Sequence, residues 1–214
     1  MKSARTIRAA ALLVAGQLIA TAAMAGVQLG SNLLTNGGAE AGEGSADGYT
    51  VLPVPKWTSN GNFTVVLYGA PNFPNQDSPG PAKRGLKFFA GGPDNAESSI
   101  SRTLNLKSLS ADIDTGTVQG TLTGYLGGFS SQEDHADLAV TYLDATGAEL
   151  ATTSLQTVTA TDRANVTGML KRKAVAHVPV GTRSARVVLT MTRLAGSYND
   201  GYADALSLVL IKKP

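Results

Sequence analysis

The strongest constraint on this chain is the two-residue alternation of apolar side chains in its short runs. Two segments, residues 184–193 and 203–211, have apolar residues at alternate positions. These are Ala185, Val187, Leu189 and Met191 in the first segment and Leu206, Leu208 and Leu210 in the second. Alternation places such residues on one face of a β-strand. No window of 11 or more residues after position 25 has a helical period. The sequence therefore predicts an all-β fold.

Further short runs are separated by Gly, Asn, Asp and Pro. Residues 99–106 would place Ile100, Leu104 and Leu106 on one face, and residues 117–126 and 173–178 read as further strands. Residues 138–143 and 149–155 flank the turn sequence Asp144-Ala145-Thr146-Gly147, which predicts a hairpin. We predict a single antiparallel β-sandwich, a jelly roll, of about eight to ten strands.

The first 25 residues read as a signal peptide. Lys2, Arg5 and Arg8 precede an apolar stretch over residues 9–23, and Ala23-Met24-Ala25 has the small-x-small pattern of a cleavage site. The apolar stretch is shorter than the roughly 20 residues that a membrane-spanning helix needs. We therefore expect cleavage after Ala25, a domain over residues 26–214, a secreted or periplasmic location, and no membrane span in the mature chain.

Charge and cysteine content exclude several classes of function. Removing the three positive charges of residues 1–25 moves the formal net charge from +2 to −1. The mature chain has no basic tract that would neutralise phosphates, so nucleic acid is not an expected partner. The chain has no cysteine, which excludes disulfides, thiolate catalysis and Cys-ligated metal centres.

Both ends of the mature chain carry a family resemblance. Residues 32–42 read NLLTNGGAEAG, Trp57 follows, and residues 199–208 read NDGYADALSL. This combination resembles the galactose-binding-like jelly rolls, which include many carbohydrate-binding modules. The resemblance implies that the first and last strands lie close together and that a structural calcium ion is held there by Glu40 and Asp204, with backbone carbonyls completing its oxygen shell. Alternatively, Glu40 caps or pairs locally, and Asp204 accepts hydrogen bonds from backbone amides at the entrance of the last strand.

Carbohydrate binding needs aromatic faces beside polar groups. We predict Trp57, Tyr125 and Phe129 as ligand-binding residues; Trp57 also suits a core position, and the other two flank a glycine pair at 127–128. Tyr68, Phe73 and Tyr198 are further aromatic candidates. Phe88 and Phe89 point to opposite faces if they lie on a strand, so one belongs to the core and the other can be exposed. The irregular segments 37–55 and 70–84 are either functional or mobile.

No catalytic constellation stands out. His135 lies in a polar loop among Glu133, Asp134 and Asp137, no Gly-x-Ser-x-Gly occurs, and Asp112 with Asp114 is a possible carboxylate pair. The sequence therefore predicts an exported, non-catalytic binding module, with a glycan as the ligand that the resemblance implies. One alternative is a structural or adhesive envelope protein. Another is an extracellular glycan hydrolase or lyase, which would bring Asp134, His135 or Asp137 together with another acid. The oligomeric state does not follow from the sequence.

Overall fold

The structure is a computed structural model that describes residues 27–213. The predicted signal peptide and its cleavage site after Ala25 lie outside the described residues. Within residues 27–213, no helix is long and apolar enough to cross a membrane.

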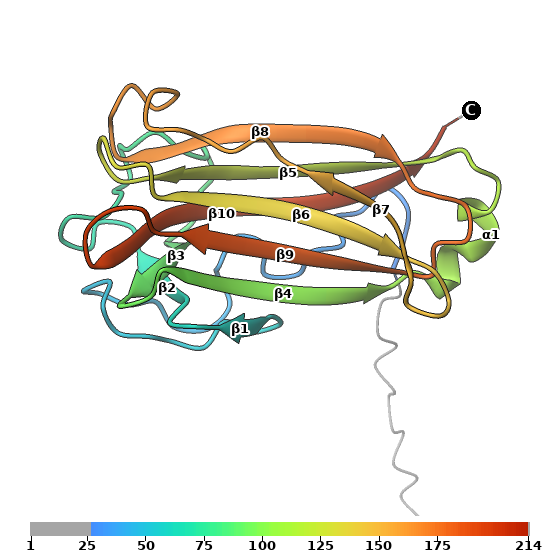
Figure 1. The fold of residues 1–214 in the computed structure, drawn as a ribbon, viewed down its shortest axis with the longest axis horizontal. Helices are drawn as coiled ribbons and strands as arrows, with labels where there is room; N and C mark the ends of the chain where they lie inside the picture. The colour runs from blue at the N-terminus through green and yellow to red at the C-terminus, as the bar shows by residue number, and fades with distance from the viewer. Residues whose placement is uncertain (1–26, 214) are drawn as a thin grey trace, which may run out of the picture.

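The described residues form ten strands and two short helical turns (Figure 1). In chain order they are β1 (Thr58–Asn60), β2 (Thr64–Leu67), β3 (Lys87–Pro93), β4 (Glu97–Asn105), the 3-10 turn η1 (Lys107–Leu109), α1 (Ser110–Ile113), β5 (Val118–Gly128), β6 (His135–Leu143), β7 (Glu149–Ser154), β8 (Gly168–His177), β9 (Ser184–Thr192) and β10 (Tyr198–Lys212).

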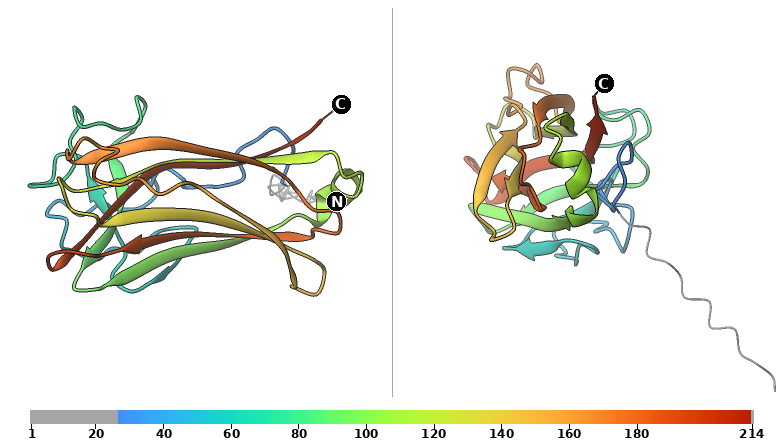
Figure 2. Two further views of the ribbon diagram at one scale, coloured as in Figure 1. Left: turned by 45° about the horizontal axis from the view of Figure 1, so that its top comes forward. Right: turned by 90° about the vertical axis from the view of Figure 1, so that its right-hand side faces the viewer.

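The strands form two five-stranded sheets, which lie one above the other in the left view of Figure 2. Sheet A has the order β2-β3-β10-β5-β8, and sheet B has the order β1-β4-β9-β6-β7. Every pairing within the two sheets is antiparallel. The predicted antiparallel sandwich and its strand number are confirmed, and β6 and β7 form the predicted hairpin.

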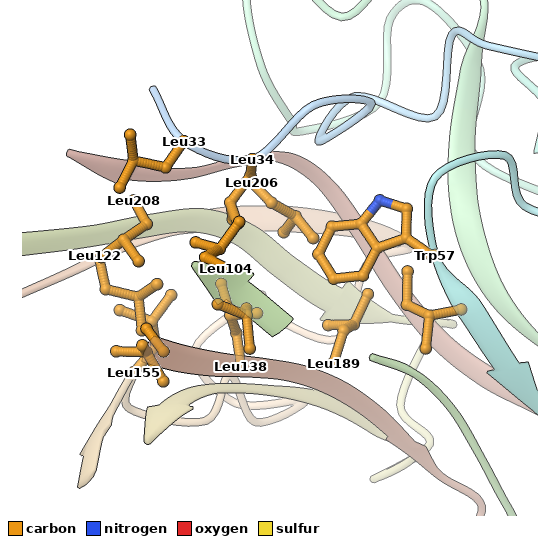
Figure 3. Packing of buried hydrophobic residues seen from close by; sticks show 14 of the residues in the cluster. Leu33, Leu34, Trp57, Leu104, Leu122, Leu138, Leu155, Leu189, Leu206 and Leu208 are labelled. Atoms are coloured by element: carbon orange, nitrogen blue, oxygen red, sulfur yellow. The ribbon is translucent and has the colours of Figure 1, made fainter. Parts of the chain in front are cut away.

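The alternation seen in the sequence produces the core between the sheets. On β9 the residues Ala185, Val187, Leu189 and Met191 are fully buried, and Leu206, Leu208 and Leu210 of β10 face them across the interior. Figure 3 shows how the leucines of both sheets meet in this layer. Burial of apolar area is the main favourable term in folding, so this layer holds the sandwich together.

The N-terminal segment runs beside the last strand, as the resemblance implied. The amides of Gly30 and Leu33 donate hydrogen bonds to the carbonyls of Leu210 and Leu208, and the Asn32 side chain bonds both Leu206 and Leu208. This segment therefore covers the part of β10 that lies beyond the end of its pairing with β3.

A bulge in β10 changes which face its side chains occupy. The register shifts between Asp204 and Ser207, and Ala205 adopts a φ of 51°. Tyr202 and Asp204 consequently point to the outer face of sheet A, the face turned away from sheet B, whereas Leu206 points into the core.

The outer face of sheet A has an apolar cluster of its own, which we call the outer cluster. It consists of Val66, Ala70, Phe88, Ala90, Met169, Tyr198 and Tyr202, with Tyr68, Phe73, Tyr125 and Phe129 packed against it. Phe88 and Phe89 do point to opposite faces, but both are fully buried: Phe89 lies in the main core and Phe88 in the outer cluster.

Candidate functional site

An aromatic pocket opens at one end of the outer cluster. The end of β5 and the start of β10, which contribute to it, lie on the left of Figure 1. The volume of the pocket is about 250 Å³. Six residues line it: Tyr49, Asn72, Phe73, Phe129, Tyr198 and Asp200. The four rings come from two long loops, the end of β5 and the start of β10, so residues far apart in sequence form one site.

The loop that carries Tyr49 is held in place by its own hydrogen bonds. The Asp47 carboxylate accepts from the Ser45 hydroxyl at 2.6 Å and from the amides of Tyr49 and Thr50 at 2.9 and 3.0 Å. These bonds, with that from Ser45 the largest, hold the pKa of the Asp47 carboxyl far below its usual range. Ser45 in turn pairs with β2 through backbone bonds. The exposed Tyr49 ring therefore extends from a constrained turn.

Phe73 is seated against the same turn. Its ring lies where a Cβ on Gly48 would be, 2.0 Å from that position, and Gly48 has a φ of +80°. Only glycine meets both requirements without strain. The loop of Phe73 is fixed from the other side because the Met169 amide of β8 donates to Pro79 O at 2.8 Å. Both loops that the sequence identified as irregular thus contribute walls to the pocket.

Asp200 supplies the carboxylate of the pocket. Its side chain is half-buried and accepts a hydrogen bond from the Tyr202 hydroxyl. Its amide donates to the buried Asp134 at 3.0 Å, and Asp134 also accepts the amides of Leu194 and Ala195. Asp134 therefore fixes the backbone beneath the pocket.

Burial raises the pKa of the Asp200 carboxyl to about 6. The Tyr202 hydrogen bond opposes this shift, the charge of Asp134 adds to it, and Arg163 opposes it. Arg163 is itself 3 % exposed and donates to the carbonyl oxygens of Ser130, Gln132 and Val166. At neutral pH the carboxylate of Asp200 is thus mainly ionised.

The structure separates the three predicted ligand residues. Phe129 lines the pocket, whereas Tyr125 lies on the same face of sheet A, opposite Asp204, outside the lining. Trp57 lies in the main core, packed edge-on to Phe89, with its indole N–H donating to Asn36 O at 3.2 Å (Figure 3). For Trp57 the structure supports the core role that the sequence left open.

Tyr49, Asn72 and Asp200 were not identified from the sequence as ligand-binding residues. The residues that line the pocket with them belong to other segments, and no sequence motif indicates that these segments lie close together. The one available signal was the clustering of Gly, Pro, Asn and Asp in residues 37–55 and 70–84, which pointed to the loops but not to the side chains.

At the predicted calcium site, an ammonium group holds the backbone around Glu40. The Nζ of Lys87 lies 2.9 Å from Glu40 O and 2.7 Å from Gly42 O. The Glu40 carboxylate accepts the amides of Leu86 and Lys87, both at 3.0 Å. Because these amides lie 46 and 47 residues further along the chain, Glu40 binds the start of β3 instead of the local turn that the sequence offered as an alternative.

Asp204 is buried and its two oxygens are also engaged. The Tyr68 hydroxyl donates to Oδ2 at 2.8 Å and the Ala205 amide donates to Oδ1. Burial raises the pKa of Asp204 to about 7, against the lowering effect of these hydrogen bonds. The guanidinium of Arg84 lies 5.2 Å above the Tyr68 ring.

These contacts engage oxygens that a calcium ion between Glu40 and Asp204 would use. Calcium needs six to eight oxygens, and the carbonyl oxygens of Glu40 and Gly42 already accept hydrogen bonds from Lys87. The predicted calcium site stays a prediction, and the contacts favour Lys87 as the cation of this region.

The acids considered for catalysis are engaged in structural contacts. Asp112 pairs with Lys212 and Asp114 with Arg183. His135 lies 3.3 Å from Asp137, whose hydrogen bond is the largest cause of a raised His135 pKa. Of this set only Asp134 meets another acid, Asp200, and both oxygens of Asp134 already accept backbone amides.

A larger hollow of about 370 Å³ lies at the opposite end of the sandwich, between the end of β4 and the β6–β7 turn. Its lining is polar: Thr103, Asn105, Lys107, Asp144, Ala145, Thr146, Gly147, Arg183 and Ser184. Asp144 is occupied by the amides of Thr146 and Ala148. Because no aromatic ring lines it, the pocket around Tyr49 is the better candidate for a sugar ligand.

No protein-family model and no curated protein sequence matches the chain. Solved structures do. The enzymatically active domain of tailspike protein 4 from bacteriophage CBA120 is 16% identical, with 84% of this chain and 21% of that chain covered and a TM-score of 0.49. This chain therefore spans about a fifth of the length of that solved chain.

Two carbohydrate-binding modules are matched along nearly their full length. TmCBM61, solved with β-1,4-galactotriose, is 17% identical over 86% of this chain and 99% of that chain, with a TM-score of 0.47. A family 22 module of Clostridium thermocellum Xyn10B is 15% identical over 77% and 96%, with a TM-score of 0.45. Likeness at this level does not identify a ligand.

Proposed function

We propose that the chain is an exported, non-catalytic module that binds a glycan in the aromatic pocket around Tyr49. The observation that carries the proposal is the convergence of four rings with one amide and one carboxylate, Asn72 and Asp200, in a single hollow. Aromatic faces stack on the C–H faces of sugar rings, while amide and carboxylate oxygens accept hydroxyl protons.

The geometry is suited to a small ligand portion. A volume of about 250 Å³ is at the lower end of small-molecule pockets and accommodates one sugar unit or a substituent rather than several units. Both loops that form its walls are fixed by internal hydrogen bonds, so little ordering entropy is lost on binding.

The non-catalytic part of the proposal rests on how the acids are used. The Asp134 carboxylate accepts hydrogen bonds from three backbone amides beneath the pocket. Asp200 is therefore the single carboxylate in the lining of the pocket. Glycoside hydrolysis usually needs two carboxyl groups that flank the bond. Export is proposed on the signal-peptide pattern of residues 1–25.

Retention on insoluble polysaccharides and calorimetry with oligosaccharides test the function. Galactan and xylan are suitable first probes, because TmCBM61 was solved with β-1,4-galactotriose and a further similar structure is a xylan-binding domain from CBM 22. We expect Tyr49→Ala to abolish retention without unfolding, since Tyr49 is 60 % exposed. Leu194→Ala, at an equally exposed apolar position (64 %), is the matched control. Equal retention by wild type and Tyr49→Ala would contradict the proposed site and favour a structural role.

A further inference from the structure

Three rings of the pocket stand nearly perpendicular to one another. Tyr49 and Tyr198 have ring centroids 5.3 Å apart at 71°, Phe73 and Tyr198 are 5.1 Å apart at 74°, and Tyr49 and Phe73 are 6.4 Å apart at 79°. Each pair is arranged edge to face, so the rings form a corner, and Phe129 adds a fourth ring to the lining. The face of an aromatic ring carries negative charge density and attracts cations.

The carboxylate in this corner has no cationic partner. The Asp200 side chain accepts the Tyr202 hydroxyl, and among residues 27–213 no lysine, arginine or histidine nitrogen lies within ion-pair distance of it. An ionised carboxylate that is partly removed from water and has no counter-charge is destabilising unless something compensates it.

The charges around the pocket supply only part of that compensation. Asp134 lies directly beneath Asp200, and Asp47 lies in the turn that carries Tyr49. The cation that acts on Asp200 is Arg163, whose guanidinium is buried and bonded to three backbone carbonyls. No basic residue lines the pocket. The electrostatic potential in the pocket therefore favours a positively charged ligand and disfavours an anionic one.

We propose that the pocket recognises an organic ammonium group, held by the ring faces of Tyr49, Phe73 and Tyr198 and by the carboxylate of Asp200. The ammonium group is carried on the glycan, a point that rests on the function proposed above. Two sources share this chemistry: the protonated amine of a 2-amino sugar, and a quaternary ammonium substituent of the choline type. Polysaccharides rich in uronic acid are excluded by the same potential.

Two ligand pairs that differ in charge test the inference on the complete mature chain. The first pair is choline and its neutral isostere 3,3-dimethylbutan-1-ol, and the second is glucosamine oligosaccharides at pH 6.5 and their N-acetylated counterparts. We expect the charged member of at least one pair to bind about tenfold more tightly, the size of a desolvated cation–π contact. Preference in the first pair identifies the quaternary ammonium source, and preference in the second identifies the amino sugar.

Variants assign the effect to the pocket. Asp200→Asn removes the charge and keeps the shape, and it should lower affinity for the charged ligand about tenfold while leaving the neutral one unchanged. Asp77→Asn makes the same change in net charge on an exposed loop and is the matched control. Tyr49→Ala should remove binding of both.

The inference is overturned if neutral and charged members bind equally, or if Asp200→Asn binds the charged member as wild type does. If neutral and charged sugars bind equally and their binding still depends on Tyr49, the glycan-binding function is supported and only the specificity for an ammonium group is disproved. Binding of no oligosaccharide of either pair, with choline still retained, would instead remove the glycan function.

Discussion

The hydroxyl of Tyr198 donates a 2.8 Å hydrogen bond to the carbonyl oxygen of Gly48, across 150 positions of sequence and away from solvent. It fastens the first residue of β10 to the turn that presents Tyr49. The walls of the pocket are therefore connected to each other as well as to the sheet, which is how a site made of loops keeps a fixed shape.

Tyr198→Phe should weaken both the fold and the site. It leaves the buried Gly48 carbonyl without its donor, at an expected cost of about 1–2 kcal/mol in unfolding free energy, and it frees the Tyr49 turn. Urea denaturation and calorimetry with the bound ligand measure the two effects. Tyr49→Phe, on an exposed ring, is the control and should keep wild-type stability. A Tyr198→Phe variant as stable as wild type would show that the bond does not hold the turn.

The two glycines of the sequence Asn36-Gly37-Gly38 should differ sharply in how well they tolerate substitution by alanine. A Cβ on Gly37 would lie 2.2 Å from Leu206 O, whereas a Cβ on Gly38 meets only Asp204 Oδ1, at 3.5 Å. Gly37→Ala must push the N-terminal segment away from β10, so we expect a loss of about 2 kcal/mol or more. Gly38→Ala should stay close to wild type. Thermal melts of both variants decide this, and equal melting temperatures would contradict the close approach.

Asp204 should make stability fall as the pH rises. Because its pKa is raised from 3.8 to about 7 in the folded state, the folded chain binds this proton more tightly than the unfolded chain, and unfolding free energy declines between about pH 4 and pH 7. Asp204→Asn should therefore be more stable than wild type at pH 8, by about 1–4 kcal/mol, and lose that advantage near pH 4. Asp200, whose pKa is raised to about 6, makes the unfolding free energy depend on pH equally in the wild type and in Asp204→Asn. Its contribution therefore cancels when the two are compared. A pH-independent difference between the two chains would disprove the assignment.

Calcium should leave the melting temperature unchanged, because the ammonium of Lys87 already occupies the carbonyls of Glu40 and Gly42. Lys87→Met should lower stability by about 1–3 kcal/mol with or without chelator, since two charge-assisted hydrogen bonds are lost. Lys83→Met, on an exposed loop residue, should have no effect. A large calcium-dependent rise in the wild type would restore the predicted metal site and remove Lys87 from its role.

The alternation in residues 184–193 and 203–211 was enough to predict the inner faces of β9 and β10. Alternation expresses a local geometry, and every strand of a sandwich must turn its apolar side inward, so the pattern carries over to the structure. It was not enough for Asp204, because the bulge at Ala205 reverses the face and leaves no mark on the sequence. It also could not show that Phe88 is buried, because the second apolar layer exists only where loops cover the outer face of sheet A.

The sequence by itself determined the all-β class, the antiparallel hairpin of β6 and β7, the core faces of β4, β9 and the C-terminal half of β10, and the loops that carry the site. These follow from the two-residue period and from turn chemistry, which act over a few neighbouring residues. The tertiary structure alone decided that Trp57 is core, that Lys87 binds the carbonyls beside Glu40, and that Tyr49, Phe73, Tyr198 and Asp200 form one pocket. Each of these depends on contacts between segments 21 to 150 residues apart, which the packing of the two sheets sets and no local pattern encodes.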